Sequence, residues 1–195
     1  SGRLEVPGGR LHVGDLVRAN DTIPLFDQLV PPALRDTPIG TVYEWRGDNL
    51  PLALGRRLAH QGGTALIIDY GYDKTAPGET LQAVSGHKFV EPLDSPGEAD
   101  ITAHVDFQAF ADAADSMGAR VFGPITQATF LRRLGIEKRV EALTALAPPD
   151  KAAEIGRGVK RLIAEGPKEM GTLFKVMAIA NPSLGTIPGF DLELK

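Results

Sequence analysis

The stretch GEADITAHVDF, residues 97–107, alternates polar side chains that can do chemistry with apolar ones. On an extended backbone, alternate side chains point to the same face. The polar face of this stretch then carries Asp100, Thr102, His104 and Asp106. We expect that face to line a crevice, where His104 accepts a proton and an aspartate orients its imidazole ring.

Asp106 has a second use at the end of the same stretch. It comes directly before a helical pattern in which Phe107, Phe110 and Ala114 share one face. A carboxylate at this position accepts hydrogen bonds from the first backbone N–H groups of a helix. We therefore favour helix capping over catalysis for Asp106.

A second group of candidates lies at the end of the apolar run TALIIDYG, residues 64–71. Such a run is typical of a strand buried on both faces in a parallel sheet. Ligands collect at the carboxyl ends of these strands, so Asp69 and Tyr70 would face a crevice and Gly71 would let the chain turn sharply. The alternative is that Asp69 caps a turn and Tyr70 covers the edge of the sheet.

Glu44 lies near the end of another predicted strand, GTVYEWR, residues 40–46. Its carboxylate can face a crevice in the same way as that of Asp69. It can equally form an ordinary ion pair beside Trp45 and Arg46, because carboxylates at strand ends often pair with cations. Both interpretations stay open.

The histidines and aspartates of this region raise the question of a metal site. Side chains of the types that bind zinc or iron are present at His87, Asp100, His104 and Asp106. No compact motif such as His-Glu-x-x-His brings them together. We predict no metal, and a metal-dependent hydrolase built on His87 and His104 is the third candidate function.

Several other chemistries are excluded by what the chain lacks. It has no cysteine, which excludes disulfides, thiolate zinc sites and a cysteine nucleophile. No Gly-x-Ser-x-Gly elbow, Gly-x-Gly-x-x-Gly loop or Walker loop follows a predicted strand. The net charge of -4, without a basic block, argues against a nucleic-acid partner. No apolar run is long enough to span a bilayer, so we expect no membrane insertion.

The elements that would position these residues begin with a β-meander and loop segment in residues 1–39, where short apolar pieces alternate with glycine and proline. A strand over residues 40–46 comes next. A helix follows, capped at Asp48 or the next residue and ending at Gly62. With the strand at residues 64–71, this order makes a crossover unit and indicates an α/β fold.

The rest of the chain shows alternating helical and extended patterns. We predict a helix after Asp106, a strand over residues 119–125, three helices over residues 126–134, 137–146 and 150–164, and a final strand over residues 172–180.

Four blocks in order carry a family resemblance: GGTALIIDYGY, GEADITAHVDF, GPITQATFLRRLGI and MGTLFKVMAIAN. Together they resemble the MidA-like family of S-adenosylmethionine-dependent methyltransferases. That family includes the mitochondrial arginine methyltransferase of NADH dehydrogenase assembly. The resemblance runs from near Gly40 to Asn181 and implies a class I, Rossmann-like methyltransferase sheet.

Within that fold, the resemblance makes residues 64–71 the fifth strand of the sheet. It pairs residues 119–125 with residues 172–180 as an antiparallel hairpin that ends the sheet. Residues 40–195 are then the carboxyl-terminal part of a methyltransferase domain, with a helical insertion over residues 126–166.

The family binds S-adenosylmethionine with a glycine-rich loop, an acidic residue and an Asn-Glu motif on the fourth strand. None of these occurs in the 195 residues. The chain is therefore expected to be the carboxyl-terminal part of the enzyme, with most cofactor-binding residues outside it. No cofactor-binding residue is assigned here.

The implied reaction of the complete enzyme is methyl transfer to a protein arginine. Carboxylates hold a guanidinium by two parallel hydrogen bonds and turn the attacking nitrogen toward the methyl group. Candidates for this clamp are Asp69, Glu44 and Asp100. His104 or Tyr70 would take or relay the proton that is lost after transfer.

Three further residues are expected to contact the substrate: Gly71, His87 and Thr102. The rival interpretation is a non-catalytic assembly module, in which the meander and the inserted helices bind a partner protein. The expected partner is a protein substrate, and a homodimer is a candidate assembly. The expected compartment is the cytoplasm of a bacterium or the mitochondrial matrix of a eukaryote.

Overall fold

A computed structural model describes residues 30–38, 41–45, 47–94 and 97–190. The chain divides into two compact units, which are described separately. Unit 1 comprises residues 1–46 and 76–104, and unit 2 comprises residues 47–75 and 105–195. Most of the predicted meander lies outside the described residues, so the predicted boundary at residue 39 stays a prediction.

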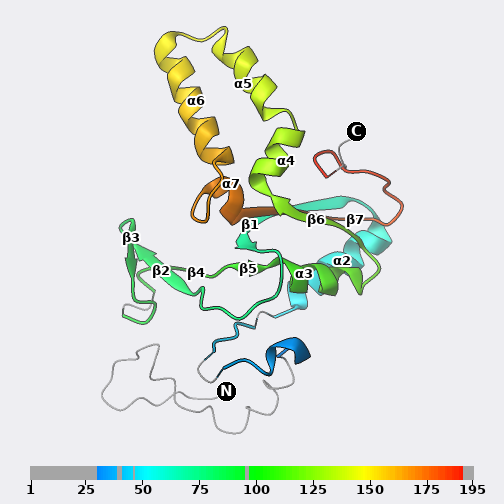
Figure 1. Cartoon of the computed structure of the whole chain (residues 1–195). Helices are drawn as coiled ribbons and strands as arrows, with labels where there is room; N and C mark the ends of the chain where they lie inside the picture. The colour runs from blue at the N-terminus through cyan, green and yellow to red at the C-terminus, as the bar shows by residue number, and fades with distance from the viewer. Residues whose placement is uncertain (1–29, 39–40, 46, 95–96, 191–195) are drawn as a thin grey trace. The chain divides into compact units, whose positions relative to one another are not determined.

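Unit 2 is built on a four-stranded sheet with the order β5-β1-β7-β6 (Figure 1). Its strands are β1 (Thr64–Tyr72), β5 (Val105–Asp106), β6 (Arg120–Thr126) and β7 (Phe174–Ala180). Strand β7 lies between β1 and β6 and is antiparallel to both. The predicted antiparallel ending of the sheet is therefore confirmed, and the fold is mixed α/β.

Two helices pack on one face of this sheet, α2 (Asn49–Gln61) and α3 (Phe107–Asp115). The core between helices and sheet contains Leu58, Phe107, Ala114, Ala119, Met177 and Ile179. A Cβ atom at Gly55 of α2 would lie 2.5 Å from the carbonyl oxygen of Ala114 in α3. Glycine at this position therefore lets the two helices approach each other closely.

The other face of the sheet is covered only in part. Phe122 of β6 lies on this face, and its ring contacts that of Phe190, which in turn contacts Phe130. Over β1 the cover is thinner, because Leu66 is 49% exposed and Ile68 is 47% exposed. The prediction that β1 is buried on both faces is wrong for this structure, since the aromatic cluster lies over the β6 side.

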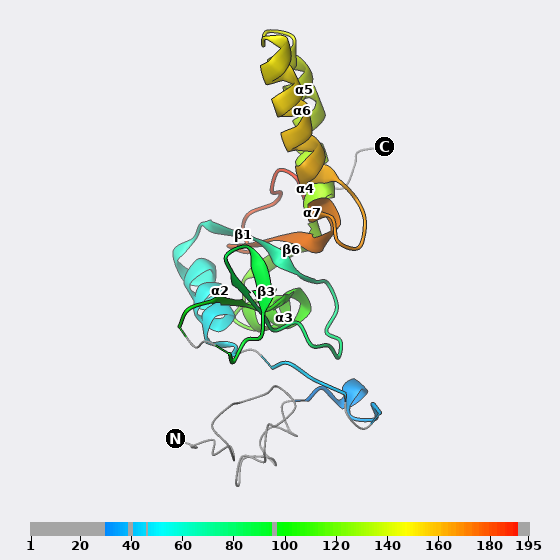
Figure 2. The same ribbon diagram turned by 90° about the vertical axis from the view of Figure 1, so that its left-hand side faces the viewer.

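The three helices predicted over residues 126–164 are present as α4 (Gln127–Arg133), α5 (Ile136–Thr144) and α6 (Pro149–Ile163), and their status as an insertion stays a prediction. Helices α5 and α6 run side by side, as Figures 1 and 2 both show. A short helix, α7 (Met170–Leu173), comes before β7. The predicted strand over residues 172–180 is therefore wrong at its first two residues, which form the last part of α7.

Unit 1 contains a three-stranded antiparallel sheet with the order β3-β2-β4. Its strands are β2 (Gln82–Ser85), β3 (Lys88–Val90) and β4 (Asp100–Thr102). The turn between β2 and β3 has positive φ at both central residues, 56° at Gly86 and 62° at His87. Turns of this kind match the twist of antiparallel strands and close tight hairpins.

Residues 41–45 form neither a helix nor a strand, so the strand predicted over residues 40–46 is wrong within the described part. The backbone groups here bond to turns and loops instead. Thr41 N–H donates to Pro38 O at 3.1 Å, and Gly78 N–H donates to Val42 O at 3.0 Å. The predicted crossover from this segment to β1 is also absent, because the parallel neighbour of β1 is β5.

Candidate functional site

The eight predicted site residues divide between the two units. Asp69, Tyr70 and Gly71 lie on β1 in unit 2. Unit 1 holds Glu44, His87, Asp100, Thr102 and His104. Each group is therefore considered within its own unit.

Asp69 is half-buried on β1 and lies opposite Lys175 of β7 in the strand register. Its Oδ1 accepts a hydrogen bond of 2.8 Å from the backbone N–H of Tyr70. The Lys175 ammonium donates to the carbonyl oxygen of Thr172 at 2.6 Å. A carboxylate of this kind can accept charge-assisted hydrogen bonds from a guanidinium.

Tyr70 pairs with Phe174 across the β1–β7 ladder. The two rings meet edge to face, with centroids 5.5 Å apart and an interplanar angle of 89°. This geometry is favourable for aromatic pairs and fixes the direction of the Tyr70 ring. Because β1 lies between β5 and β7, this contact does not place Tyr70 at an edge of the sheet, and both interpretations of Tyr70 stay predictions.

Gly71 is buried inside β1, which continues through Tyr72. The predicted sharp turn at this glycine is therefore wrong. Gly71 instead pairs with Val105 of β5, and an added Cβ would clash with the Val105 carbonyl oxygen and lie 2.9 Å from the Phe107 ring. The missing side chain lets β5 and the start of α3 pack directly against β1.

Glu44 is the centre of a hydrogen-bond network in unit 1. Its Oε1 accepts from the backbone N–H groups of Thr80 and Leu81, both at 2.9 Å. Its Oε2 accepts from the Thr80 hydroxyl at 2.5 Å. The same hydroxyl oxygen accepts from the backbone N–H of His104 at 3.0 Å. We call Glu44, Thr80 and His104 the Glu44 network.

The Glu44 network connects two residues that the sequence singled out, Glu44 and His104, through one that it did not. Thr80 is 36 residues from Glu44 and 24 residues from His104. No local pattern indicates such a contact. The two oxygens of the Glu44 carboxylate accept three hydrogen bonds from Thr80 and Leu81, and they therefore hold the loop that contains these two residues in place.

We expect Glu44→Ala to loosen the loop without unfolding the protein. The change leaves the Thr80 and Leu81 N–H groups without their acceptor, at a cost of about 2 kcal/mol, or roughly 30-fold faster amide exchange. Hydrogen exchange at the Thr80, Leu81 and His104 amides measures this. Glu79→Ala removes an exposed neighbouring carboxylate and is the control. Equal exchange in the two variants would show that the network does not hold the loop in solution.

The stretch GEADITAHVDF, residues 97–107, does not form one continuous strand. Asp100 and Thr102 lie on β4 in unit 1, whereas Asp106 lies on β5 in unit 2. The prediction that four polar residues share one extended face is therefore wrong. The reason is that residues 103–104 separate two strands that belong to different sheets.

Asp106 caps α3, as predicted. It is only 5% exposed, and its Oδ1 accepts from the Ala109 backbone N–H at 3.0 Å. The same oxygen accepts from the Thr75 hydroxyl at 3.0 Å. These bonds account for the burial of the carboxylate, because a buried charge needs hydrogen-bond donors.

The remaining unit 1 candidates lie at opposite ends of the small sheet. His87 is exposed in the β2–β3 turn, and Thr102 pairs with Gln82 at the far end of β2. Among the described residues, no group of three or more His, Asp or Glu side chains could hold a metal ion. Nothing in the described geometry favours the hydrolase interpretation.

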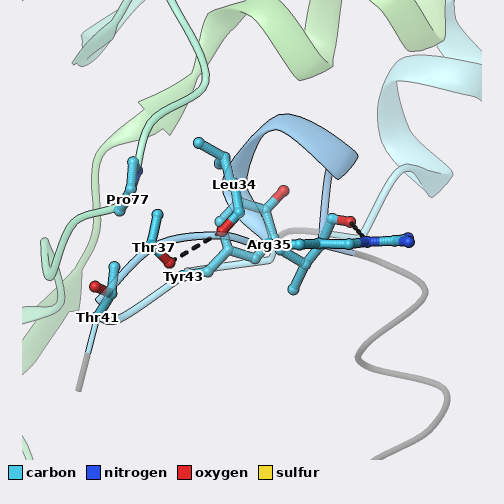
Figure 3. A pocket seen from close by; sticks show the side chains of 7 residues that line it. Leu34, Arg35, Thr37, Thr41, Tyr43 and Pro77 are labelled. Atoms are coloured by element: carbon cyan, nitrogen blue, oxygen red, sulfur yellow. Dashed lines mark hydrogen bonds between the residues drawn. The ribbon is translucent and has the colours of Figure 1, made fainter. Parts of the chain in front are cut away.

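Two hollows lie away from all of these residues. The first, in unit 1, has a volume of about 430 Å³ and is lined by Leu34, Thr37, Tyr43 and Pro77, among others (Figure 3). Its Thr37 hydroxyl donates to Leu34 O at 3.0 Å. The second lies on α2 beside Arg56, Arg57 and His60. Neither contains a predicted site residue.

The mixed sheet, closed by an antiparallel pair and covered by helices, is of the kind expected for a class I methyltransferase. A family model described as an S-adenosyl-L-methionine-dependent methyltransferase matches residues 25–125, about half of the chain. The chain belongs to this family, in agreement with the resemblance of its sequence blocks.

Relatives in animals show the same relationship. The zebrafish (Danio rerio) protein arginine methyltransferase NDUFAF7, mitochondrial, is 37% identical over 128 residues, which are 66% of this chain and 29% of that protein. The Drosophila melanogaster homologue is 40% identical over 129 residues, 65% of this chain and 28% of that protein. This chain thus matches less than a third of the length of these relatives.

Solved structures from Burkholderia thailandensis support the fold. One, a native crystal structure, has a TM-score of 0.58 and 32% identity, and covers 71% of this chain and 39% of that one. A second is bound to S-adenosyl-homocysteine, with a TM-score of 0.57, 32% identity, and coverage of 71% of this chain and 38% of that one.

In the part of the chain that the structure describes, none of the helices combines the length and the apolar composition that crossing a bilayer requires.

Proposed function

We propose that the natural polypeptide containing this chain transfers a methyl group from S-adenosylmethionine to an arginine side chain of a protein. The observation that carries the proposal is the 37–40% identity to relatives named protein arginine methyltransferases. A solved relative that holds S-adenosyl-homocysteine supports the same cofactor, since that molecule is the demethylated product of S-adenosylmethionine.

We propose that the described residues of this chain do not form the main part of the cofactor site. Strand β1 is followed by the segment DKTAPGET, and β5 leads directly into α3. Neither connection is a glycine-rich loop of the kind that lets a backbone approach a nucleotide. We therefore propose that most of the S-adenosylmethionine-binding residues lie outside the described residues.

The role proposed for this chain is to bind and orient the acceptor arginine. Asp69 of unit 2 is the first candidate for the carboxylate that clamps the guanidinium, and Asp100 of unit 1 is the alternative candidate. Glu44 is proposed to position His104 through Thr80, because its oxygens already accept three hydrogen bonds. His104 and Tyr70 remain the candidates for proton transfer, and Gly71, His87 and Thr102 for substrate contacts.

Methyl transfer to protein extracts tests the proposal. The natural polypeptide is incubated with labelled S-adenosylmethionine, and the modified residues are identified by mass spectrometry. We expect methylarginine, and we expect no label when the modified arginine of the acceptor is replaced by lysine. Binding of a partner protein without any methyl transfer would instead support the non-catalytic assembly module.

The names of the relatives also suggest a compartment. Both animal relatives are named mitochondrial. We propose the mitochondrial matrix for a eukaryotic source and the cytoplasm for a bacterial one, and a protein as the partner. A homodimer remains a prediction, which sedimentation of the purified polypeptide measures directly.

A further inference from the structure

The small sheet of unit 1 places an aromatic ring and a carboxylate on either side of one central residue. In the strand register, Val84 of β2 pairs with Phe89 of β3 on one side and with Asp100 of β4 on the other. Directly paired residues of antiparallel strands point to the same face. Neighbouring strands are about 4.8 Å apart, so Phe89 and Asp100 stand about 10 Å apart with Val84 between them.

The flanking side chains of this trio are open to solvent. Phe89 is 78% exposed, an unusual position for a large apolar ring, and Asp100 is also exposed. Among the described residues, the Asp100 carboxylate takes part in no hydrogen bond or ion pair. The opposite face of β2 differs, since Ala83 is fully buried there.

The charge around this face is strongly negative. Residues 86–102 contain four carboxylates, at Glu91, Asp94, Glu98 and Asp100, against a single ammonium at Lys88. Most of the net charge of the chain, -4, is therefore concentrated in this short segment. A cationic partner is attracted to such a surface, and an anionic one is repelled.

We propose that Phe89, Val84 and Asp100 form an arginine-binding face that holds an arginine of the acceptor protein. A guanidinium is planar, so it can stack on the Phe89 ring while its N–H groups donate two parallel hydrogen bonds to Asp100. The separation of about 10 Å leaves room for one such group over Val84. This inference rests on the proposed function only in one respect, namely that the bound arginine belongs to the acceptor protein.

A titration of the ¹⁵N-labelled chain with two peptides tests the arginine-binding face. The probes are acetyl-Gly-Gly-Arg-Gly-Gly-amide and the same peptide with lysine. We expect the arginine peptide to shift the amide signals of Val84, Phe89 and Asp100. The lysine peptide should bind about tenfold more weakly, because an ammonium lacks the planar fork.

Two variants and two matched controls locate the binding. Asp100→Asn should weaken arginine binding about tenfold by removing the charge-assisted pair, and Phe89→Leu about threefold by removing the ring. Glu98→Gln removes a nearby exposed carboxylate, and Ile101→Ala changes the other face of β4. Glu98→Gln should weaken binding much less than Asp100→Asn, because its charge only attracts the cation from a distance, and Ile101→Ala should leave binding unchanged.

Two results would overturn the arginine-binding face. One is equal affinity for the arginine and lysine peptides. The other is equal weakening by Asp100→Asn and Glu98→Gln, which would show only a general attraction to acidic charge.

The outcomes for the arginine-binding face and for the proposed methyltransferase function can be distinguished. If the arginine peptide binds this face while the natural polypeptide methylates no protein, the face stands and the methyltransferase proposal fails. If the polypeptide methylates arginine and Phe89→Leu leaves the KM of the acceptor unchanged, the methyltransferase proposal stands and the face fails.

Discussion

Asp69→Asn is expected to lower the rate of methyl transfer by the natural polypeptide about 100-fold, which is the usual cost of misplacing a reacting group. Asparagine has the same shape and keeps an oxygen that can accept from the Tyr70 N–H, as Asp69 does at 2.8 Å. It loses the charge that would hold the guanidinium by two hydrogen bonds. The expected change is therefore in catalysis and not in folding.

The measurement is kcat with an arginine-containing acceptor, accompanied by a thermal unfolding curve of each variant. Asp73→Asn is the matched control, because Asp73 follows β1 and is exposed. It should change neither the rate nor the unfolding temperature. If Asp69→Asn retains the full rate, Asp69 does not clamp the acceptor and the proposed clamp must be sought at Asp100.

Gly71→Ala should destabilise unit 2 by about 2–3 kcal/mol, in the upper range for overpacked sites. The new methyl group would meet the Val105 carbonyl oxygen and the Phe107 ring. Both neighbours are fixed, since Val105 pairs with β1 and Phe107 is fully buried. The strand pair must therefore separate to admit the side chain.

Urea unfolding of the purified chain measures this effect as a shift in the midpoint. Gly156→Ala is the control, because Gly156 lies in α6 and nothing lies within 4 Å of an added Cβ. That change should stabilise the helix by about 0.5–1 kcal/mol, the difference in helix propensity between the two residues. Identical midpoints for the two variants would contradict the close packing described at Gly71.

The helices of this chain were largely predictable from local sequence. The apolar spacing after Asp106 and the carboxylate before it predicted α3 and its cap, and both are present. The three inserted helices were likewise placed to within two residues at each end. Such elements follow from capping and periodicity within one short segment.

The pairing of strands was less predictable from the residues alone. An apolar run such as residues 64–71 does not reveal whether its neighbours are parallel or antiparallel. The antiparallel pairing of β6 with β7 was anticipated only through the family resemblance, and the position of β7 beside β1 was not predicted. The strand predicted over residues 40–46 was wrong because its alternating pattern occurs in a loop whose polar groups bond elsewhere.

In the candidate site, too, contacts between residues adjacent in sequence were predictable, and contacts between distant residues were not. Asp106 and its role could be predicted because cap and helix are adjacent in sequence. Thr80 could not, because its partners Glu44 and His104 lie far along the chain. Gly71 was singled out correctly as unusual, but the reason is close packing and not a turn.

Residues 76–104 belong to unit 1 and interrupt the sequence of unit 2. The hydrogen bond between Thr75 and Asp106 joins the two ends of unit 2 that flank this segment. Residues of unit 2 alone therefore hold the two ends of this segment together, whatever its length. Lengthening such a segment costs little closure entropy, since the cost grows only with the logarithm of its length. Unit 2 can therefore accommodate a change in the length of residues 76–104 at little cost to its own sheet.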